Sequence, residues 1–525
     1  MRKLTIIILL FAATASASLF INSFNSGQLG KDLKSRHDLD RTSMGSEELS
    51  NILIRPQGMA FKRPGTEFVE SRLTSVGTAE VLGDYPTLRA TTAQADPGLT
   101  HTMAISNVTE LQEMEDNRAG NYYLTCNIDA SGVEWDPIGT YSSFFTGTLD
   151  GCGYTVSNLT ISSGVSYASL LGNVLGASVA NLTLSDVSIV GESHFTGALA
   201  GHVYLYEGYD FYVYNCHSSG TISRDPTEAT LRESGGLIGT IERYSGQSNC
   251  FAFIYDSSSS CDLDHTGDGT GWYSGGFVGL ARNTTFQNCY ATGSLLNGDY
   301  TGTQWGGFIG RCESDTFNYC YATGSIEGGG GKDGGFFGGE APNCTFTKCS
   351  ATGDVDSKEN AGGFGGDAIS SLTEPVTFTD CYAWGDVSVT DDTVGGFLGV
   401  GTDNYITFTN CYSVGAPTGT TSGGFGGIID DNSIVAACYW DTETSGQETT
   451  SNDIGDGHIT TWMKTKTNYT DVGWDFDDIW YSAYTASTLV NVSGTVRLIP
   501  FEFSVSEAYV IELGHEYISF FRTTP

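Results

Sequence analysis

Carboxylates are the residues of this sequence best suited to acid–base chemistry, and their placement bears on whether the chain could be an enzyme. Acidic residues such as Asp430-Asp431 and the run Asp475, Asp477 and Asp478 occur near expected turns. Glycoside hydrolysis needs two carboxylates across a cleft, and other carboxylate chemistry on polysaccharides needs a basic partner. Residues 100–494 contain only 11 Lys and Arg, which are scattered. We therefore predict no catalytic residue and no enzymatic activity.

A short acidic segment, Asp262–Asp268, is the candidate for cation binding. Its first carboxylates and Gly267 suit a hand-type calcium loop, but the twelfth position is Tyr273 instead of the bidentate Glu that such a loop requires. An acidic turn is the simpler interpretation. We predict no metal ligand and no cofactor, apart from Ca²⁺ held weakly by acidic loops.

Thirteen cysteines are present, without the closely spaced Cys-x-x-Cys pairs of structural zinc sites. Many recur at one place in a repeat, which favours buried small apolar side chains over disulfides between repeats. Five lie outside that register and are the better disulfide candidates: Cys126, Cys152, Cys261, Cys312 and Cys344.

The element that must position these residues is an internal repeat. The string Gly-Gly-Phe-x-Gly recurs six times from Gly275 onward, and its Phe positions are 28 to 33 residues apart. A second string, Phe-x-x-Cys-Tyr, follows at a steady offset and continues with Ala or Ser. The repeat positions that we expect to build the structure are Gly275, Phe277, Cys289, Tyr290, Phe308, Cys320, Tyr321, Phe336, Cys349, Phe364, Cys381, Tyr382, Phe397, Cys411, Tyr412, Phe425 and Cys438.

A repeat of about 30 residues fits one coil of a β-solenoid with two or three short strands. Equivalent residues of neighbouring coils would stack roughly 4.8 Å apart as ladders of Phe, Cys and Tyr. Strand alternation places Cys289 and Ala291 on one face and Tyr290 on the other. Either face could be the inner one, and we favour the small residues inside because a narrow solenoid corner has little room. Phe286 then has the wrong parity for one straight strand, so we expect a bend or a bulge before Cys289. A short helix near Leu111–Met114 is expected to cap the stack.

Composition agrees with turn-dense β structure, because 69 Gly accompany only 11 Pro and aromatic residues make up 12% of the chain. The net charge of −37 excludes nucleic acid as a partner of the whole surface. Residues 1–17 resemble a secretory signal, with Arg2-Lys3, an apolar run and Ala15-Ser16-Ala17. That run is too short to span a membrane as a helix, and no later segment qualifies.

The strings Gly-Gly-Phe-x-Gly and Cys-Tyr-Ala-Thr-Gly resemble the GLUG motif of bacterial surface adhesins and filamentous-haemagglutinin-like proteins. This resemblance implies an all-β fold, a right-handed parallel β-helix or β-solenoid over residues 105–480, with small mostly-β segments at both ends. It also implies a surface or adhesive role.

Two flanking segments, residues 18–70 and 481–525, resemble a tail or tail-tube structural protein of tailed bacteriophages. The strings that carry this likeness include Arg55-Pro56-Gln57-Gly58, Arg63-Pro64-Gly65-Thr66 and the strand-like Val496–Phe503. With residues 71–104 as a linker, the repeats would be an insertion into one virion module. The last strands cannot bury their apolar faces unaided, so either the first segment completes them or the chain is a fragment. The signal-like start departs from this pattern, because virion proteins assemble in the cytoplasm.

Three functional hypotheses follow. The first is a phage tail component that displays the solenoid for attachment to a host surface, with other tail proteins as partners and the virion as location. The alternative is a secreted bacterial adhesin at the cell surface. In either case the ligand would be a cell-surface glycan or protein receptor. The third, a polysaccharide-degrading β-helix enzyme, requires the carboxylate pair that the sequence does not provide.

Overall fold

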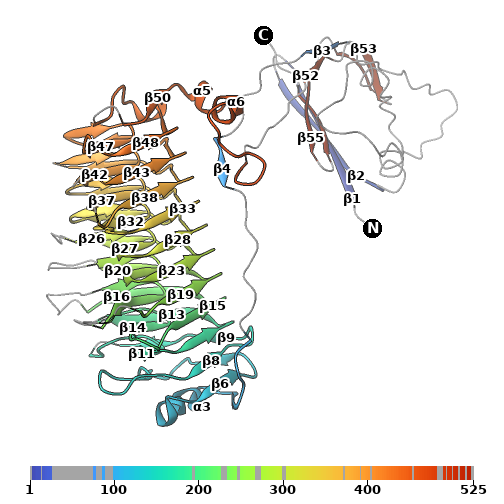
Figure 1. Ribbon diagram of the computed structural model, residues 1–525. Coiled ribbons are helices and arrows are strands. Elements are labelled where there is room, and N and C mark those ends of the chain that lie inside the picture. Colours follow the sequence, from blue (N-terminus) through green and yellow to red (C-terminus); the bar gives the residue numbers. More distant parts are fainter. Residues whose placement is uncertain are drawn as a thin grey trace. The chain divides into compact units, whose positions relative to one another are not determined.

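Stacked β coils form the main body of the computed structural model (Figure 1). The structure describes residues 85–88 and 98–481 apart from short internal gaps, and the backbone of strands in both terminal segments. The chain divides into two units, residues 87–481 and residues 1–86 with 482–525. It is nearly all β, with 51% strand and 7% helix, and the first of these units is a parallel β-solenoid of about nine turns. The predicted fold class is therefore confirmed.

Each complete coil runs through four parallel sheets, which we call I to IV in chain order. Sheet I has strands β5 Met103–Ile105, β6 Asn121–Leu124, β8 Thr148–Asp150, β12 Ser178–Ala180, β15 Phe211–Tyr214, β19 Ala252–Tyr255, β23 Thr284–Gln287, β28 Thr316–Asn318, β33 Thr345–Thr347, β38 Val376–Thr379, β43 Ile406–Thr409 and β48 Ile434–Ala436. Sheet III has β17 Ser234–Gly235, β21 Tyr273–Gly275, β26 Gln304–Gly306, β31 Lys332–Gly334, β36 Ala361–Gly362, β41 Thr393–Gly395 and β46 Thr421–Gly423.

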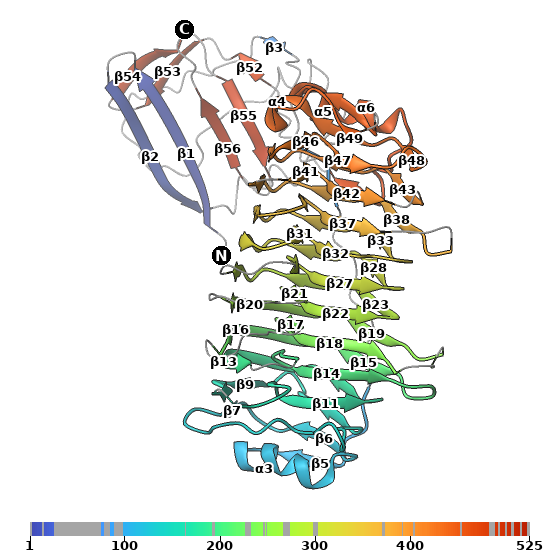
Figure 2. The same cartoon turned by 90° about the vertical axis from the view of Figure 1, so that its left-hand side faces the viewer.

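Sheets II and IV complete the coil. Sheet IV runs up the middle of Figure 2 and has β11 Leu171–Leu175, β14 Ala200–Leu205, β18 Ile238–Arg243, β22 Val278–Arg282, β27 Ile309–Glu313, β32 Phe337–Gly339, β37 Gly365–Ile369, β42 Leu398–Thr402 and β47 Gly426–Ile429. Sheet II has β7 Ile128–Asp129, β9 Thr155–Ser157, β10 Thr160–Ile161, β13 Thr183–Gly191, β16 His217–Arg224, β20 Ser258–His265, β24 Tyr290–Ala291, β25 Leu295–Asn297, β29 Tyr321–Ala322, β30 Ile326–Gly329, β34 Ser350–Ala351, β35 Val355–Ser357, β39 Tyr382–Ala383, β40 Val387–Val389, β44 Tyr412–Ser413, β45 Pro417–Thr418, β49 Tyr439–Asp441 and β50 Asp456–His458.

Two columns of phenylalanine fill the centre of the coils. In one column Phe336, Phe364 and Phe397 stack with ring centroids 4.9 Å apart, and in the other Phe346 and Phe378 stack at 5.0 Å. The columns meet edge to face, which is the arrangement that the quadrupole of an aromatic ring favours. From Phe277 onward the core is thus a repeated aromatic contact between neighbouring coils, whereas the earlier coils have aliphatic residues such as Leu199 and Leu237 in their core.

A left-handed residue makes the bend between sheets I and II. Asn288 has φ 57° and lies between Phe286 and Cys289, so both side chains point inward despite their odd spacing. Asn and Asp tolerate this backbone region better than most residues, and the Asn288 amide also donates to Asp256 of the preceding coil over 2.8 Å. The bend expected from sequence is a left-handed turn and not a bulge.

Glycines at the corner between sheets III and IV allow the coils to approach closely. A Cβ at Gly335 would overlap the carbonyl oxygen of Gly363 in the next coil. The Gly-Gly pair of each repeat therefore exists because the neighbouring backbone occupies the place of a side chain.

Both ends of the stack are covered by short helices. At the start, α3 Val108–Gln112 continues into the 3-10 helix η1 Glu113–Asn117, with Leu111 and Met114 buried. At the end lie α4 Thr442–Ser445, α5 Thr460–Met463 and α6 Lys466–Thr470, and β51 Trp480–Tyr481 pairs with β4 Thr87–Leu88. No helix among the described residues is long and apolar enough to cross a membrane.

The terminal unit joins the two ends of the chain. Strands β1 Lys3–Ala12 and β2 Ala15–Asn25 are antiparallel, and β1 also pairs with β56 Tyr517–Phe521, the partner of β55 Tyr509–Gly514. Strand β3 Ser75–Gly77 pairs with β52 Leu489–Asn491, and β53 Gly494–Leu498 pairs with β54 Phe501–Val505. The phage-like strings at residues 55–66 lie outside the described residues, and the signal-like apolar run forms most of β1.

The repeat tyrosines, which we expected to point outward, differ in how much of each side chain is exposed. Tyr290 is half-buried and Tyr321 is 39% exposed, whereas Tyr382 and Tyr412 are buried. All point out of the coil, but Trp480 of the C-terminal segment packs against Tyr382 and Tyr412 and shields them from water. An outward direction is set by the strand, while exposure is set by what packs outside it.

Two other expectations need correction. Asp262 and Asp264 lie on β20 and not in a turn, while Asp268 is outside the described residues. The predicted disulfides are absent, since all thirteen cysteines lie in the described part of the chain and each is a thiol. Cys261 is enclosed by Ser218 and Ser259, and Cys312 faces Cys344 of the next coil.

The repeat cysteines form a buried ladder in which each coil hydrogen-bonds to the next, as when Tyr321 N donates to Cys289 O over 3.1 Å. Burial raises the pKa of Cys216 to about 12 and raises the pKa values of Cys289, Cys349 and Cys411. Such thiols behave as small apolar side chains, because the reactive thiolate is disfavoured in a dry interior.

Replacing one central ring tests the stacked core. Phe364→Ala should lower the free energy of unfolding by about 3–5 kcal/mol, because it leaves a cavity between two columns. Urea unfolding followed by circular dichroism measures the change. The control Tyr321→Ala removes a partly exposed ring of the preceding coil and should cost about 1 kcal/mol or less. Equal losses in both variants would contradict a core built on the phenylalanine columns.

Thiol accessibility tests the cysteine ladder. In native protein near neutral pH, iodoacetamide should alkylate Cys152, which is exposed, and Cys126, which is partly exposed, and spare the buried cysteines. Peptide mass spectrometry after timed labelling gives the rate at each position. After denaturation all thirteen should react. A ladder cysteine that reacts as fast as Cys152 in the native protein would overturn this picture.

Candidate functional site

Exposed aromatic side chains gather at one corner of two neighbouring coils, between sheets IV and I. Their exposed fractions range from 41% to 55%, and their clustering distinguishes them from single exposed rings such as Tyr141 and Tyr405. With half-buried Phe253 they define the aromatic patch: Tyr206, Tyr209, Tyr212, Tyr244, Phe251 and Phe253. Exposed apolar groups that cluster in this way are typical of binding surfaces.

A tight turn after β14 presents the first rings. Tyr206 and Tyr209 form an antiparallel bridge, Tyr209 N donates to Tyr206 O over 2.8 Å, and Gly208 has φ 83°. Tyr244 follows β18 of the next coil, and its N donates to Leu205 O over 3.0 Å. The Tyr206 ring lies 6.3 Å from Tyr209 and 6.0 Å from Tyr244. Backbone contacts therefore hold three rings in one group.

The second group lies on β15 and β19, where parallel pairing sets Tyr212 beside Phe253. Their rings stack at 5.0 Å, and Phe251 lies 6.4 Å from Phe253. Both rings point out of sheet I because the neighbouring positions Val213 and Ile254 are buried.

Polar groups lie among the rings. Asp210 sits between the two groups in sequence, and its Oδ1 accepts from Phe251 N over 3.0 Å. The pKa of Tyr212 is raised by partial burial and by the neighbouring Asp210 carboxylate. Gln247 Oε1 accepts from Glu207 N over 3.3 Å. The patch thus combines flat apolar faces with carboxylate and amide groups.

The carboxylates of one groove on sheet II bind the backbone of neighbouring coils. An open groove of about 370 Å³ on sheet II is lined by Glu327, Asp354, Asp356 and Asp386 among other residues. Asp354 and Asp386 stand in one column on consecutive coils, and Asp354 Oδ1 accepts from Asp386 N over 2.9 Å. Carboxylates on one column do not face each other across a substrate.

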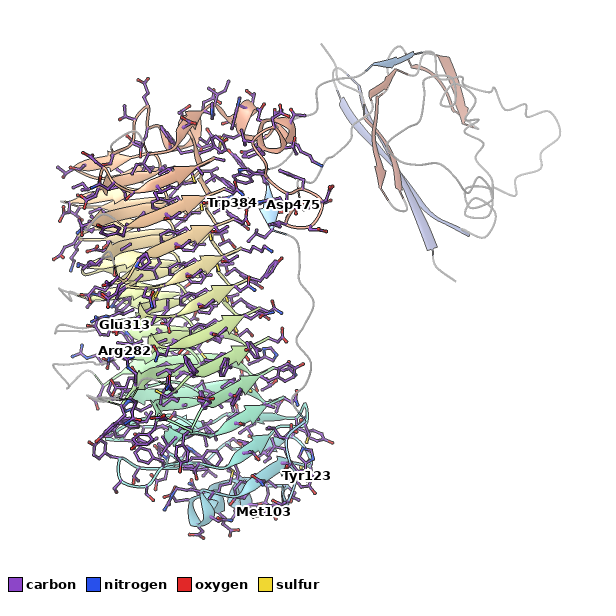
Figure 3. The ribbon with its side chains drawn as sticks, viewed as in Figure 1. Met103, Tyr123, Arg282, Glu313, Trp384 and Asp475 are labelled. Atoms are coloured by element: carbon purple, nitrogen blue, oxygen red, sulfur yellow. The ribbon has the colours of Figure 1, made fainter. Side chains whose placement is uncertain are left out.

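The carboxylates of sheet IV form ion pairs between coils. Arg282 Nε lies 2.9 Å from Glu313 Oε2 (both labelled in Figure 3), and Arg311 Nη2 lies 2.5 Å from Glu340 Oε2. Arg282, Arg311 and Lys332 thus form ion pairs that bridge neighbouring coils. Exposed pairs of this kind contribute about 0–1 kcal/mol each, so they fix register more than stability.

The sequence pointed to the repeat positions and not to the aromatic patch. The structure places the repeat phenylalanines and cysteines in the interior and brings them together in columns. The patch lies in early, degenerate coils, where Tyr206-Glu207-Gly208-Tyr209-Asp210 departs from the repeat. Aromatic residues beside a turn signal were the available clue, but their assembly needs the register between β15 and β19.

Comparison with known proteins places a GLUG motif at residues 270–295. Halomucin of Haloquadratum walsbyi is 33% identical over 169 residues, which are 30% of this chain and 2% of halomucin. Immunoglobulin A1 protease of Streptococcus sanguinis is 24% identical over 233 residues, which are 39% of this chain and 12% of the protease. The chain therefore spans a small part of either curated relative.

Similar solved structures include a putative immunoglobulin A1 protease from Bacteroides ovatus, with 17% identity and a TM-score of 0.33 over 68% of this chain and 84% of that one. An IgA1 protease structure has 16% identity and a TM-score of 0.32 over 64% of this chain and 21% of its own. These relatives give no support to the phage-tail resemblance. The chain is a parallel β-solenoid that contains the GLUG motif.

Proposed function

We propose that this protein is a non-enzymatic, extracellular binding protein of the adhesin type, whose aromatic patch binds neutral glycans. The observation that carries the proposal is the set of exposed rings held on two coils of a rigid stack. Aromatic faces stack on the C–H faces of sugar rings, and carboxylate and amide groups beside them accept or donate hydrogen bonds to sugar hydroxyls. The patch offers both kinds of group.

The negative charge of the protein indicates which class of glycan the patch could bind. The chain has a net charge of −37, and Asp210 and Glu207 lie within the patch. Acidic sugars such as sialic acid would be repelled by this surface. A neutral glycan is therefore the expected ligand.

Names among the relatives agree with an extracellular setting, since one is called a mucin and others are named for immunoglobulin A1, an extracellular protein. The protease name belongs to whole relatives that this chain matches over a small fraction. The carboxylates described on sheets II and IV form ion pairs with basic side chains or accept hydrogen bonds from backbone amides. These roles favour a binding function over a catalytic one. A phage-tail role stays a prediction that depends on the terminal segments.

Ring removal tests the patch. Tyr206→Ala and Tyr212→Ala, one from each group, should each weaken binding of a neutral glycan roughly two- to twelvefold, as expected for about 0.5–1.5 kcal/mol per aromatic contact. A glycan array identifies the ligand, and isothermal titration measures the dissociation constant. Tyr405→Ala is the matched control, because Tyr405 is 40% exposed and lies outside the patch.

Three results would contradict the proposal. They are binding only to acidic glycans, equal binding by the patch variants and the wild type, and cleavage of a polysaccharide or protein that is lost on removal of one carboxylate. If the aromatic patch bound a protein receptor that carries no glycan, the patch would be a protein-binding surface instead.

A further inference from the structure

Three side chains with different metal-binding atoms converge near the start of the solenoid. His101 Nε2 lies 2.6 Å from Asp150 Oδ2 and 3.9 Å from Cys152 Sγ, and the three ligand atoms all lie within 4.8 Å of one another. The Asp150 side chain is 7% exposed, while His101 is 41% exposed and Cys152 is exposed. Asp150 anchors the group in the protein, whereas His101 and Cys152 are exposed to water.

The backbone and neighbouring side chains hold this arrangement. Asp150 is the last residue of β8, and its Oδ1 accepts from Cys152 N over 2.8 Å and from Asn181 Nδ2 over 3.3 Å. Its other oxygen is therefore directed at His101. The His101 ring stacks on Tyr123 of β6, which is labelled in Figure 3, at 4.7 Å and 14°. Cys152 has φ 53° in the turn that follows β8.

A single ring nitrogen faces both acidic groups, which separates this cluster from a nucleophile–His–Asp relay. In such a relay the carboxylate and the nucleophile use opposite nitrogens of the imidazole. Here Nε2 lies between Asp150 Oδ2 and Cys152 Sγ, so a cation that replaced the proton shared by His101 and Asp150 would meet all three ligand atoms in one volume. That volume suits a cation.

Charge and donor type identify the cation. Asp150 contributes a carboxylate oxygen 2.6 Å from the imidazole of His101, and the Cys152 sulfur lies 3.9 Å from the same imidazole nitrogen. One imidazole, one thiolate and one carboxylate form a donor set typical of Zn²⁺, which binds nitrogen, sulfur and oxygen in a tetrahedral site.

Bond lengths fit with small movements. Tetrahedral bonds of about 2.0–2.3 Å place neighbouring donor atoms roughly 3.3–3.6 Å apart. The separation between His101 and Asp150 would have to increase by about 0.7 Å, and that between His101 and Cys152 would have to decrease by about 0.4 Å. Asp150 Oδ2 and Cys152 Sγ lie within 4.8 Å of each other and would have to approach by up to about 1.2 Å. Exposed side chains such as His101 and Cys152 can move by such amounts without disturbing the core.

We propose that His101, Asp150 and Cys152 form a Zn²⁺ site with three protein ligands and a fourth position open to water. The site joins the segment before β5 to the turn after β8. Zn²⁺ would therefore fasten the first coils of the solenoid at the end where the stack begins. It is separate from the aromatic patch and does not depend on the proposed glycan binding.

A second cluster, Cys312, Asp315 and Cys344, has similar donor atoms but a different environment. All three side chains are buried, and burial raises the pKa of Asp315 and of both thiols. Asp315 Oδ1 also accepts from Thr284 N over 2.7 Å. Neutral groups inside a dry core do not attract a divalent cation, so this cluster belongs to the core.

Cobalt is the probe for the site, because a thiolate bound to Co²⁺ gives a charge-transfer absorption band in the near ultraviolet. Titration of the reduced full-length protein with Co²⁺ should produce this band and visible ligand-field bands at one metal per chain. Zn²⁺ should displace both. Binding should strengthen with rising pH, since His101 and Cys152 must lose their protons to bind.

Variants assign the band to these residues. Cys152→Ser should abolish the charge-transfer band, and His101→Ala should weaken Zn²⁺ binding at least roughly tenfold, the lower end of what loss of even an outer partner costs. Cys126→Ser is the matched control and should bind Co²⁺ like the wild type. Zn²⁺ should also protect Cys152, but not Cys126, from alkylation.

Circular dichroism spectra that match the wild type would show that each variant is folded. The absence of a charge-transfer band in the wild-type protein, or its persistence in Cys152→Ser, would overturn the proposal. Persistence would place the metal at other thiols.

Discussion

In-register stacking of parallel coils is the constraint on which the rest of this structure depends. Backbone hydrogen bonds link each strand to its equivalents above and below, and they leave roughly 4.8 Å between coils. That spacing suits stacked aromatic rings, and the phenylalanine columns use it from Phe277 and Phe286 to Phe408 and Phe425. Gly335 and its equivalents are required for the same reason, because the next backbone lies where a side chain would be.

Polar side chains inside the stack also depend on the alignment of neighbouring coils. Asp333 Oδ1 accepts from Trp305 N of the preceding coil over 3.0 Å, and its Oδ2 accepts from Ser357 Oγ of the following coil over 2.5 Å. Burial raises the pKa of Asp333 to about 7, although these hydrogen bonds favour the ionised form. One buried carboxyl therefore ties three coils together. Within the core, an acidic residue such as Asp333 links neighbouring coils through hydrogen bonds.

Residues on the outer surface of the coils can serve different functions because the fold is held by repeated contacts in the interior. The aromatic patch, the ion pairs of sheet IV and the His101 cluster all use residues that point away from the coil or extend from its turns. A turn such as Tyr206–Tyr209 changes length and composition without disturbing the columns. The aromatic patch thus lies where the repeat is least regular, and loops on a rigid scaffold are where binding residues are generally found.

The sequence by itself determined the period, the strand alternation and the inward direction of Phe and Cys, since these follow from local spacing repeated many times. It also located the bend before Cys289, because the parity of Phe286 demanded one. Only the tertiary structure decided which outward residues are exposed, as Trp480 covers Tyr412 across 68 residues of sequence. The contacts between Tyr212 and Phe253 and between His101 and Asp150 were also visible only in the tertiary structure. They depend on how non-repeating segments lie on the stack, which a periodic sequence pattern does not encode.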